Sequence, residues 1–133
     1  MTWEFFLKHW GQFSDSSTYL EGRIPPKKLF NALQTYAMFD TVDTIYMLYD
    51  NTVFGSAKDG LVLSQEAVSW RENPLCDTVR IKYKYLTMVE HDPLRAPKKL
   101  IVNDQEFNVI LGDDPPAIAA AICRVLRARM RES

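Results

Sequence analysis

The sequence predicts an α+β protein in which helices flank a run of antiparallel strands. Apolar residues recur at helical spacing near the N-terminus, again in residues 25–39, and at the C-terminal end. Between residues 44 and 111 the period changes to two, which is typical of half-buried strands. No helical segment interrupts this run, so the strands are expected to pair antiparallel, and a parallel α/β sheet is excluded.

Two helices are expected before the first strand. One face of residues 3–13 is apolar, and this helix is expected to end between Gly11 and Ser14. It carries Trp3, Phe6, Leu7, Trp10 and Phe13. Residues 15–23 are polar and indicate a connector. The second helix is expected to begin at Pro25 and Pro26, because proline suits a first helical turn. Its buried face is expected to hold Leu29, Phe30, Leu33 and Ala37.

Six or seven short strands are expected next. The segments "TIYMLYD", "GLVLS" and "AVSWRE" supply the first three, with "QE" between the last two. "TVRIKYKYL" alternates strictly and predicts a strand with one wet face. It places Val79, Ile81, Tyr83 and Tyr85 opposite Arg80, Lys82 and Lys84. "TMVEH" is a further candidate, and "KLIVND" and "EFNVILG" predict a hairpin that turns near residues 103–105.

The C-terminal segment predicts the longest helix. Asp113 or Asp114 can cap it, and two prolines occupy its first turn. Its apolar face has the spacing of a buried helix and consists of Ile118, Ile122, Val125 and Leu126. Arginines gather at its C-terminal end, where the helix dipole favours positive charge, and Arg127 and Arg131 are expected to be exposed.

The overall charge excludes a general attraction to nucleic acid. The net charge is −1, and residues 1–123 carry 12 basic and 16 acidic side chains, a net of −4. Residues 124–133 carry four arginines and one glutamate, a net of +3. Such a block is either a docking handle or the solvated end of a helix, and the second interpretation is favoured.

The sequence gives little support for a metal site, a disulfide bond or a membrane-spanning segment. The two cysteines form no C-x-x-C pair, and His9 and His91 are the only histidines, so we expect neither a metal site nor a cofactor. A reduced cytoplasmic environment is expected for a lone cysteine pair. The N-terminus lacks a signal-peptide pattern, and no stretch approaches the roughly 20 apolar residues of a membrane span.

The segment 50–60, "DNTVFGSAKDG", is the most distinctive motif. Gly55 and Gly60 have the glycine spacing of a phosphate-binding loop, but Leu61 and Val62 replace its Lys and Ser/Thr, and a strand follows instead of a helix. A structural role is favoured: Asp50 and Thr52 bond nearby backbone, and Asp59–Gly60 closes a turn in which Gly60 has positive φ. The functional alternative is a small polar pocket that uses Thr52, Ser56 and Lys58.

Two further groups of residues are candidate interaction surfaces. The basic stripe Arg80, Lys82 and Lys84 is either a solvated strand face or a contact surface. The aromatic residues Trp3, Phe6, Trp10 and Phe13 are core if the first helix packs on the strands, and otherwise they imply a partner or self-association. His91 stands between Glu90 and Asp92, but no nucleophile is placed near it, so no catalytic residue is assigned.

The strand order and the 50–60 motif resemble bacterial pleckstrin-homology-like (PH-like) proteins of uncharacterised function. The residues that carry the resemblance are Asp50, Thr52, Gly55, Gly60, Leu63, Ser64 and Trp70. The resemblance covers residues 44–131 and implies an antiparallel barrel closed by the C-terminal helix, in a module that binds or scaffolds. Residues 1–43 would be a helical extension, packed with residues 44–133 as one globular unit.

We therefore expect a non-enzymatic protein-binding or scaffolding module, acting on a protein partner or as a homodimer, with no nucleic acid partner. The first alternative is a small hydrolase or ligand-binding enzyme with a pocket near the 50–60 loop. The second is peripheral binding to a membrane surface, which one lysine in that loop does not favour.

Overall fold

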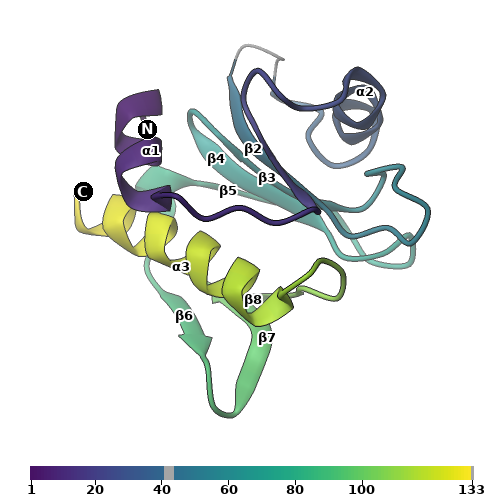
Figure 1. Cartoon of the computed structure of the whole chain (residues 1–133). Coiled ribbons are helices and arrows are strands. Elements are labelled where there is room, and N and C mark those ends of the chain that lie inside the picture. Colours follow the sequence, from purple (N-terminus) through teal and green to yellow (C-terminus); the bar gives the residue numbers. More distant parts are fainter. Residues whose placement is uncertain (41–43, 133) are drawn as a thin grey trace.

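The computed structural model describes residues 1–40 and 44–132, which form three α-helices and two antiparallel sheets (Figure 1). In chain order the elements are α1 (Trp3–Trp10), β1 (Thr18–Leu20), α2 (Pro26–Thr35), β2 (Ile45–Asp50), β3 (Gly60–Ser64), β4 (Ala67–Arg71), β5 (Val79–Lys82), the 3-10 helix η1 (Tyr83–Tyr85), β6 (Val89–Asp92), β7 (Ala96–Val102), β8 (Gln105–Asn108) and α3 (Pro115–Arg131). The α+β class predicted from the sequence is confirmed.

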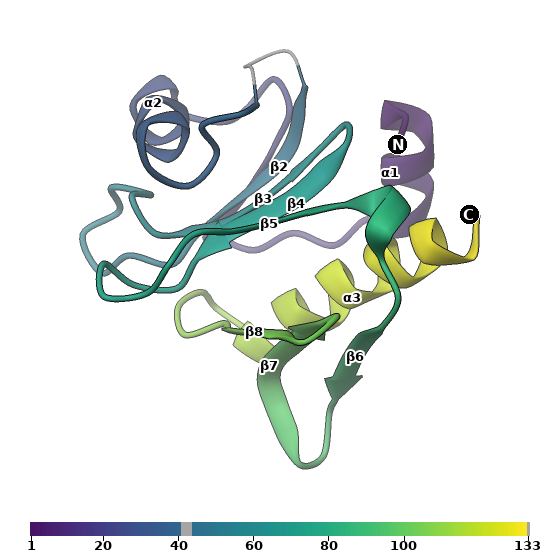
Figure 2. The ribbon, with the colours of Figure 1, turned by 180° about the vertical axis from the view of Figure 1, so that it is seen from behind.

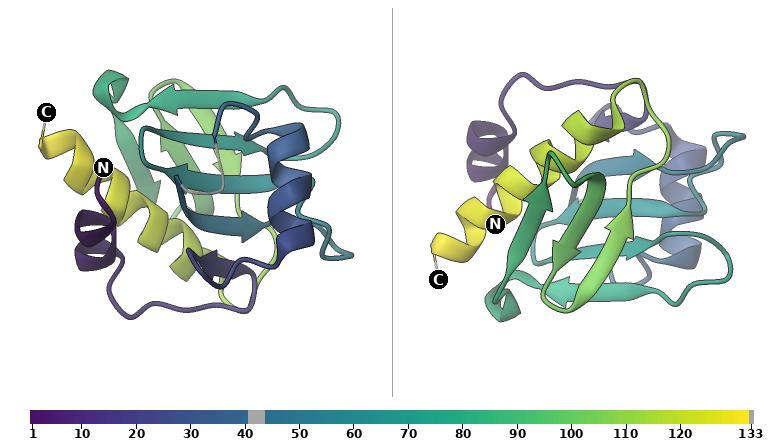
Figure 3. Two further views of the ribbon diagram at one scale, coloured as in Figure 1. Left: turned by 90° about the horizontal axis from the view of Figure 1, so that it is seen from above. Right: turned by 90° about the horizontal axis from the view of Figure 1, so that it is seen from below.

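The larger sheet has the strand order β1-β2-β3-β4-β5, and every neighbouring pair is antiparallel. Both of its faces are covered, because every residue of β2 and β3 is buried. Seen from above, α2 runs across the strands near one end of the sheet, and seen from below, α3 and the smaller sheet lie over the other face (Figure 3).

Two hydrophobic clusters follow from this layering. The smaller one lies under α2 and includes Tyr36, Ile45, Leu48 and Val62. The larger one joins the opposite face of the sheet to α1, α3 and the smaller sheet. Trp70 and Phe107 meet there with ring centroids 6.0 Å apart. The central strand β2 therefore contributes side chains to both clusters, whereas the edge strands β1 and β5 are only partly buried.

The smaller sheet has the order β6-β7-β8, and α3 packs against β6 and β7 (Figure 2). The predicted hairpin is confirmed, because Val102 pairs with Gln105 across a two-residue turn. The predicted C-terminal helix is also confirmed. Asp114 caps α3 by accepting a hydrogen bond from the Ala117 N–H at 3.2 Å. The four residues of the predicted apolar face are fully buried: Ile118, Ile122, Val125 and Leu126.

The sheets remain separate and do not close into a barrel. A cavity lies between β5 and the turn that joins β7 to β8, and Val79, Ile81, Asn103 and Gln105 are among its lining residues. The expected closure into a barrel is therefore absent between these described strands. Within each sheet, however, neighbouring strands follow one another in the chain and pair antiparallel.

Three local expectations were wrong. The polar connector 15–23 contains β1, which pairs with β2 through backbone bonds that do not require apolar side chains. The strand after residue 78 ends at Lys82, where the chain turns into η1, and the Tyr83 hydroxyl donates to the Ser64 carbonyl at 2.6 Å. On α2, Phe30 is exposed and Ala32 takes its place in the core, whereas the predicted inward positions of Leu29, Leu33 and Ala37 are confirmed.

Helix α1 packs on α3 and on the larger hydrophobic cluster. Its rings form a stack in which Phe6 lies 5.4 Å from Trp10 and 5.9 Å from Tyr46, measured between centroids. Arg124 of α3 donates to the carbonyls of His9 and Trp10, which holds the C-terminal end of α1. Within the described part of the chain, every helix falls short of the length and apolar character that a membrane crossing requires.

Candidate functional site

The loop 51–59, which connects β2 to β3, is anchored at its base by Asp50. This carboxylate is only 4% exposed. One of its oxygens accepts hydrogen bonds from the Thr52 N–H at 2.9 Å and the Thr52 hydroxyl at 2.5 Å. The other accepts a hydrogen bond from the Lys28 ammonium of α2 at 2.5 Å. Asp50 is therefore a fixed structural anchor, as the sequence predicted for its role at the loop base.

Thr52 and Ser56 hold the middle of the loop. The Thr52 hydroxyl oxygen accepts hydrogen bonds from the N–H groups of Ser56 at 2.9 Å and Ala57 at 3.2 Å. The Ser56 carbonyl accepts a hydrogen bond from the Asn31 side chain of α2 at 2.8 Å. Ala57 is fully buried and has a φ of 57°. The Ser56 hydroxyl oxygen accepts a hydrogen bond from the Lys58 N–H at 3.3 Å, so both hydroxyl groups help to shape the loop.

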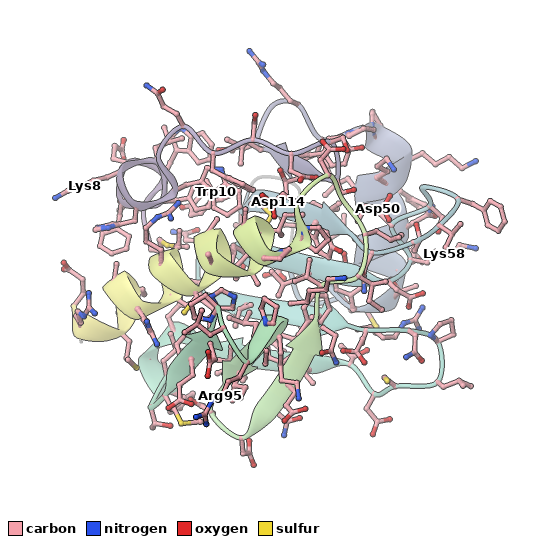
Figure 4. All side chains as sticks on the ribbon, turned by 60° about the horizontal axis from the view of Figure 1, so that its bottom comes forward. Lys8, Trp10, Asp50, Lys58, Arg95 and Asp114 are labelled. Carbon is pink, nitrogen blue, oxygen red and sulfur yellow. The ribbon has the colours of Figure 1, made fainter. Side chains whose placement is uncertain are left out.

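Lys58 points away from the loop base. Its side chain is exposed, and Figure 4 shows Asp50 and Lys58 at the end of the molecule opposite Lys8. The Lys58 carbonyl accepts a hydrogen bond from Arg71 at 3.0 Å, and Arg71 also pairs with Asp59 at 2.6 Å. The three residues of the predicted polar pocket, Thr52, Ser56 and Lys58, share a loop, but their side-chain polar groups do not converge on a common space.

Gly60 differs from its predicted place in a tight turn. It is the first residue of β3 and pairs with Asp50 and Arg71 on the neighbouring strands. Its φ is 157°. A Cβ atom at this position would lie 2.0 Å from the Tyr49 carbonyl oxygen. The glycine is therefore required by close backbone approach, and the connection is the whole loop 51–59.

The tip of the loop is apolar and exposed. Phe54 is 97% exposed and Val53 is 79% exposed. The loop 72–78, which connects β4 to β5, carries Leu75 with 97% of its side chain exposed and Cys76, a free and exposed cysteine. We call Val53, Phe54 and Leu75 the apolar tips. Sequence reasoning missed them, although two adjacent apolar residues inside a polar, glycine-containing loop are a usable signal.

A polar network holds the two loops in one framework. The Tyr49 hydroxyl donates to the Asn51 side-chain oxygen at 2.6 Å, and Asn51 in turn accepts from the Ile110 N–H at 3.1 Å. Glu72, at the start of the second loop, accepts from the Asn108 N–H at 2.6 Å. Burial raises the pKa of Tyr49, so this phenol stays protonated as a donor. The apolar tips thus rise from a fixed base.

The charge on these two loops is weakly acidic. They carry one lysine, Lys58, against three carboxylates, Asp59, Glu72 and Asp77. Lys28 and Arg71, which lie beside the loops, are each paired with a carboxylate. This end of the molecule therefore offers little attraction to a polyanion.

The predicted basic stripe is divided in the structure. Arg80 is bonded to both carboxylate oxygens of Asp40, at 3.1 and 3.0 Å, and lies over the Phe39 ring. Lys82 ends β5, and Lys84 lies on η1 with its ammonium 5.1 Å from the centroid of the Tyr85 ring. Arg80 is thus held in an ion pair, and the strand face that would align the three cations stops after Lys82.

The aromatic residues of the first helix are core. Phe6 and Trp10 are fully buried, and Trp3 and Phe13 are partly buried against the same cluster. The Trp10 indole donates to the Phe13 carbonyl at 2.9 Å. Of the two alternatives derived from the sequence, the packed helix is the one seen within this chain, so these rings offer little surface to a partner.

The titratable groups of β6 do not assemble into a proton-transfer site. The Nε2 atom of His91 lies 2.7 Å from the Pro97 carbonyl. Asp92 accepts from the N–H groups of Arg95 and Leu94, both at 3.0 Å, and these bonds lower its pKa. In residues 1–40 and 44–132, no group of three or more His, Cys, Asp and Glu side chains is arranged to hold a metal ion.

In comparisons with known proteins, no family model, no curated protein and no solved structure matches the chain.

Proposed function

We propose that the chain is a non-enzymatic protein-binding module whose contact surface is the apolar tips Val53, Phe54 and Leu75. The observation that carries this proposal is the 97% exposure of Phe54 on a loop held by hydrogen bonds at its base and middle. Large aromatic side chains that enter a partner's pocket supply much of the affinity of protein interfaces. A pre-ordered loop also loses little conformational entropy when it binds.

A protein partner fits these loops better than a membrane surface. Insertion of a loop into an anionic membrane is assisted by cations around the inserted residues. The two loops instead carry one lysine and three carboxylates. A folded partner with an apolar pocket and a weakly basic rim matches this pattern, with Phe54 as the central anchor.

An enzyme pocket near the 50–60 loop has less support. Catalytic nucleophiles and bases need polar atoms that converge on a substrate. The Thr52 hydroxyl donates to Asp50 and accepts hydrogen bonds from two backbone N–H groups. Asp50 in turn accepts from Lys28 and Thr52. These groups stabilise the loop, so they support display of the tip.

The PH-like resemblance belongs to the same proposal. The series β2 to β8 followed by α3 has the strand and helix order of such a module, with four strands in one sheet and three in the other. Strand β1 extends the first sheet at its edge, and α1 and α2 cover opposite sides. The scaffold would be a bacterial cytoplasmic binding module that carries its recognition residues on loops.

Capture from a cell extract by the immobilised full chain tests the proposal. Phe54→Ser removes the anchor, and Leu94→Ser is the matched control, because Leu94 is 92% exposed on the turn between β6 and β7. We expect a partner that the unmodified chain and Leu94→Ser retain and that Phe54→Ser loses. Equal retention by all three chains would contradict the proposal. So would Phe54-dependent sedimentation with phosphatidylglycerol vesicles in place of a protein partner.

Self-association is examined with the same variants. Light scattering gives the mass of the unmodified chain and of Phe54→Ser. A dimer that Phe54→Ser converts to a monomer would identify a second copy of this chain as the partner and would support the role of the apolar tips. A dimer that both chains form equally would place any self-association elsewhere and contradict that role for the tips.

A further inference from the structure

A second candidate site lies on α3, far along the chain from the apolar tips. A groove with a volume of about 350 Å³ runs between α3 and β6, which lie side by side (Figure 3, right). Its lining residues are His91, Pro93, Ala120, Cys123, Arg124, Arg127 and Arg131. Three arginines among seven lining residues is a strong concentration of positive charge in a chain with a net charge of −1.

The arginines are positioned by the fold. They lie at spacings of three and four residues along α3, which places them on one side of the helix. The Nε–H of Arg124 donates to the His9 carbonyl at 2.7 Å, and one of its Nη groups donates to the Trp10 carbonyl at 2.9 Å. The Nε–H of Arg127 donates to the Val89 carbonyl at 2.8 Å.

These contacts fix two of the guanidinium groups that line the groove, one against the end of α1 and one against β6. A guanidinium has more N–H donors than these bonds use, so each retains donors for a ligand. Side chains that are already ordered lose little entropy when they bind an anion. Arg131, one turn beyond Arg127, is exposed and adds a third cation.

The three arginines of the groove have two acidic neighbours on β6, Glu90 and Asp92. Among residues 1–40 and 44–132, no carboxylate lines the groove. Burial raises the pKa of the Cys123 thiol, so it stays neutral at ordinary pH. Glu90 and Asp92 are the exposed acids of β6, and the Glu90 carboxylate is close enough to contribute to the raised pKa of Cys123. Asp92 is also occupied by the N–H groups of Leu94 and Arg95.

We propose that this arginine groove binds the phosphate group of a small phosphorylated molecule. Planar guanidinium groups match the oxygen geometry of phosphate and bind it through paired charge-assisted hydrogen bonds. The volume of the groove falls in the lower part of the range for small-molecule sites, which is about 300–1,000 Å³. The proposal does not depend on the proposed function, because it uses none of the residues of the two loops.

Titration of the full chain with phosphoserine and with inorganic phosphate, followed by backbone amide NMR shifts, tests the proposal. Saturable shifts are expected in α3 and β6. Arg131→Gln should weaken phosphoserine binding by about tenfold, as expected for loss of one charge-assisted bond. Arg127→Gln should weaken it at least as much, with circular dichroism to show that the variant remains folded.

Arg23→Gln is the matched control, since Arg23 is exposed on the connection between β1 and α2 and does not line the groove. It removes the same charge and should leave binding unchanged. Absence of saturation with both probes would overturn the proposal. An equal loss in Arg23→Gln would also overturn it, by showing non-specific attraction. Binding to phosphatidylglycerol vesicles without binding to phosphoserine would overturn the proposal that the bound phosphate belongs to a small molecule.

Discussion

Lys28 of α2 and Asp50 of β2 are joined by an ion pair with an N–O distance of 2.5 Å. The same ammonium also donates to the Gly55 carbonyl at 2.6 Å. One side chain therefore connects a helix to both the base and the middle of the loop 51–59. Helix α2 thus helps to hold the loop that carries Phe54, and it also covers one face of the larger sheet.

Lys28→Met should loosen this loop. It leaves the nearly buried Asp50 carboxylate without its cation, and the loss of one partner from a buried pair lowers the free energy of unfolding by about 3 kcal/mol. Hydrogen exchange at the Ser56 and Ala57 amides should become faster, because both donate to Thr52. Lys27→Met is the control, since Lys27 is exposed. Equal stability and exchange in both variants would rule out the anchoring role.

Gly60→Ala should be strongly destabilising. The added Cβ would lie 2.0 Å from the Tyr49 carbonyl oxygen, so two adjacent strands must separate to accept it. We expect a loss of at least about 3 kcal/mol in urea unfolding. Gly22→Ala is the control: φ is 85° there, no heavy atom approaches within 4 Å, and the strain should cost only about 1–2 kcal/mol. A similar loss of unfolding free energy in the two variants would show that the close approach of the Tyr49 carbonyl does not require glycine at position 60.

Tyr36→Phe and Tyr83→Phe should have different effects. Within the described part of the chain, the buried Tyr36 hydroxyl has no hydrogen-bond partner, whereas the Tyr83 hydroxyl donates to Ser64 at 2.6 Å. Tyr36→Phe should leave stability unchanged or raise it by up to about 1 kcal/mol, and Tyr83→Phe should lower it by about 1–3 kcal/mol. Thermal unfolding measures both. A larger loss for Tyr36→Phe than for Tyr83→Phe would contradict this assignment.

Trp10→Ala should lower stability without changing the mass of the particle. Trp10 is fully buried in the larger cluster, so its loss should cost about 3–5 kcal/mol. Leu7→Ala on the same helix is the control, because Leu7 is 39% exposed. Urea unfolding and light scattering are measured together. A fall in mass with little change in stability would instead support an intermolecular role for α1.

The helices and the terminal hairpin could be predicted because their signals are local. The apolar period placed Ile118, Ile122, Val125 and Leu126 in the core, and all four are fully buried. Strand β1 could not be predicted, because its pairing with β2 satisfies the backbone and leaves its side chains only half-buried. The end of β5 could not be predicted either, since Tyr83, the first residue after it, is bonded to Ser64, which is 19 residues away.

The candidate site was predictable only in part, for the same reason. The roles of Asp50 and Thr52 at the loop base follow from short-range side-chain to backbone bonding, which the local sequence encodes. The contributions of Lys28 and Asn31 come from a helix more than 20 residues earlier in the chain. The adjacent Val53 and Phe54 in a polar loop could have indicated an apolar tip, but the 97% exposure of Phe54 depends on how the assembled loop is held.

The affinity of the captured partner for Phe54→Ala, measured by isothermal titration beside the unmodified chain, tests the central claim most directly. If Phe54 is the anchor of the contact surface, the dissociation constant should rise at least about 30-fold, in line with the loss of an interface hot spot. The free energy of unfolding should stay the same within about 0.5 kcal/mol, because the side chain is 97% exposed in the free protein. An unchanged dissociation constant would contradict the claim that the apolar tips recognise the partner.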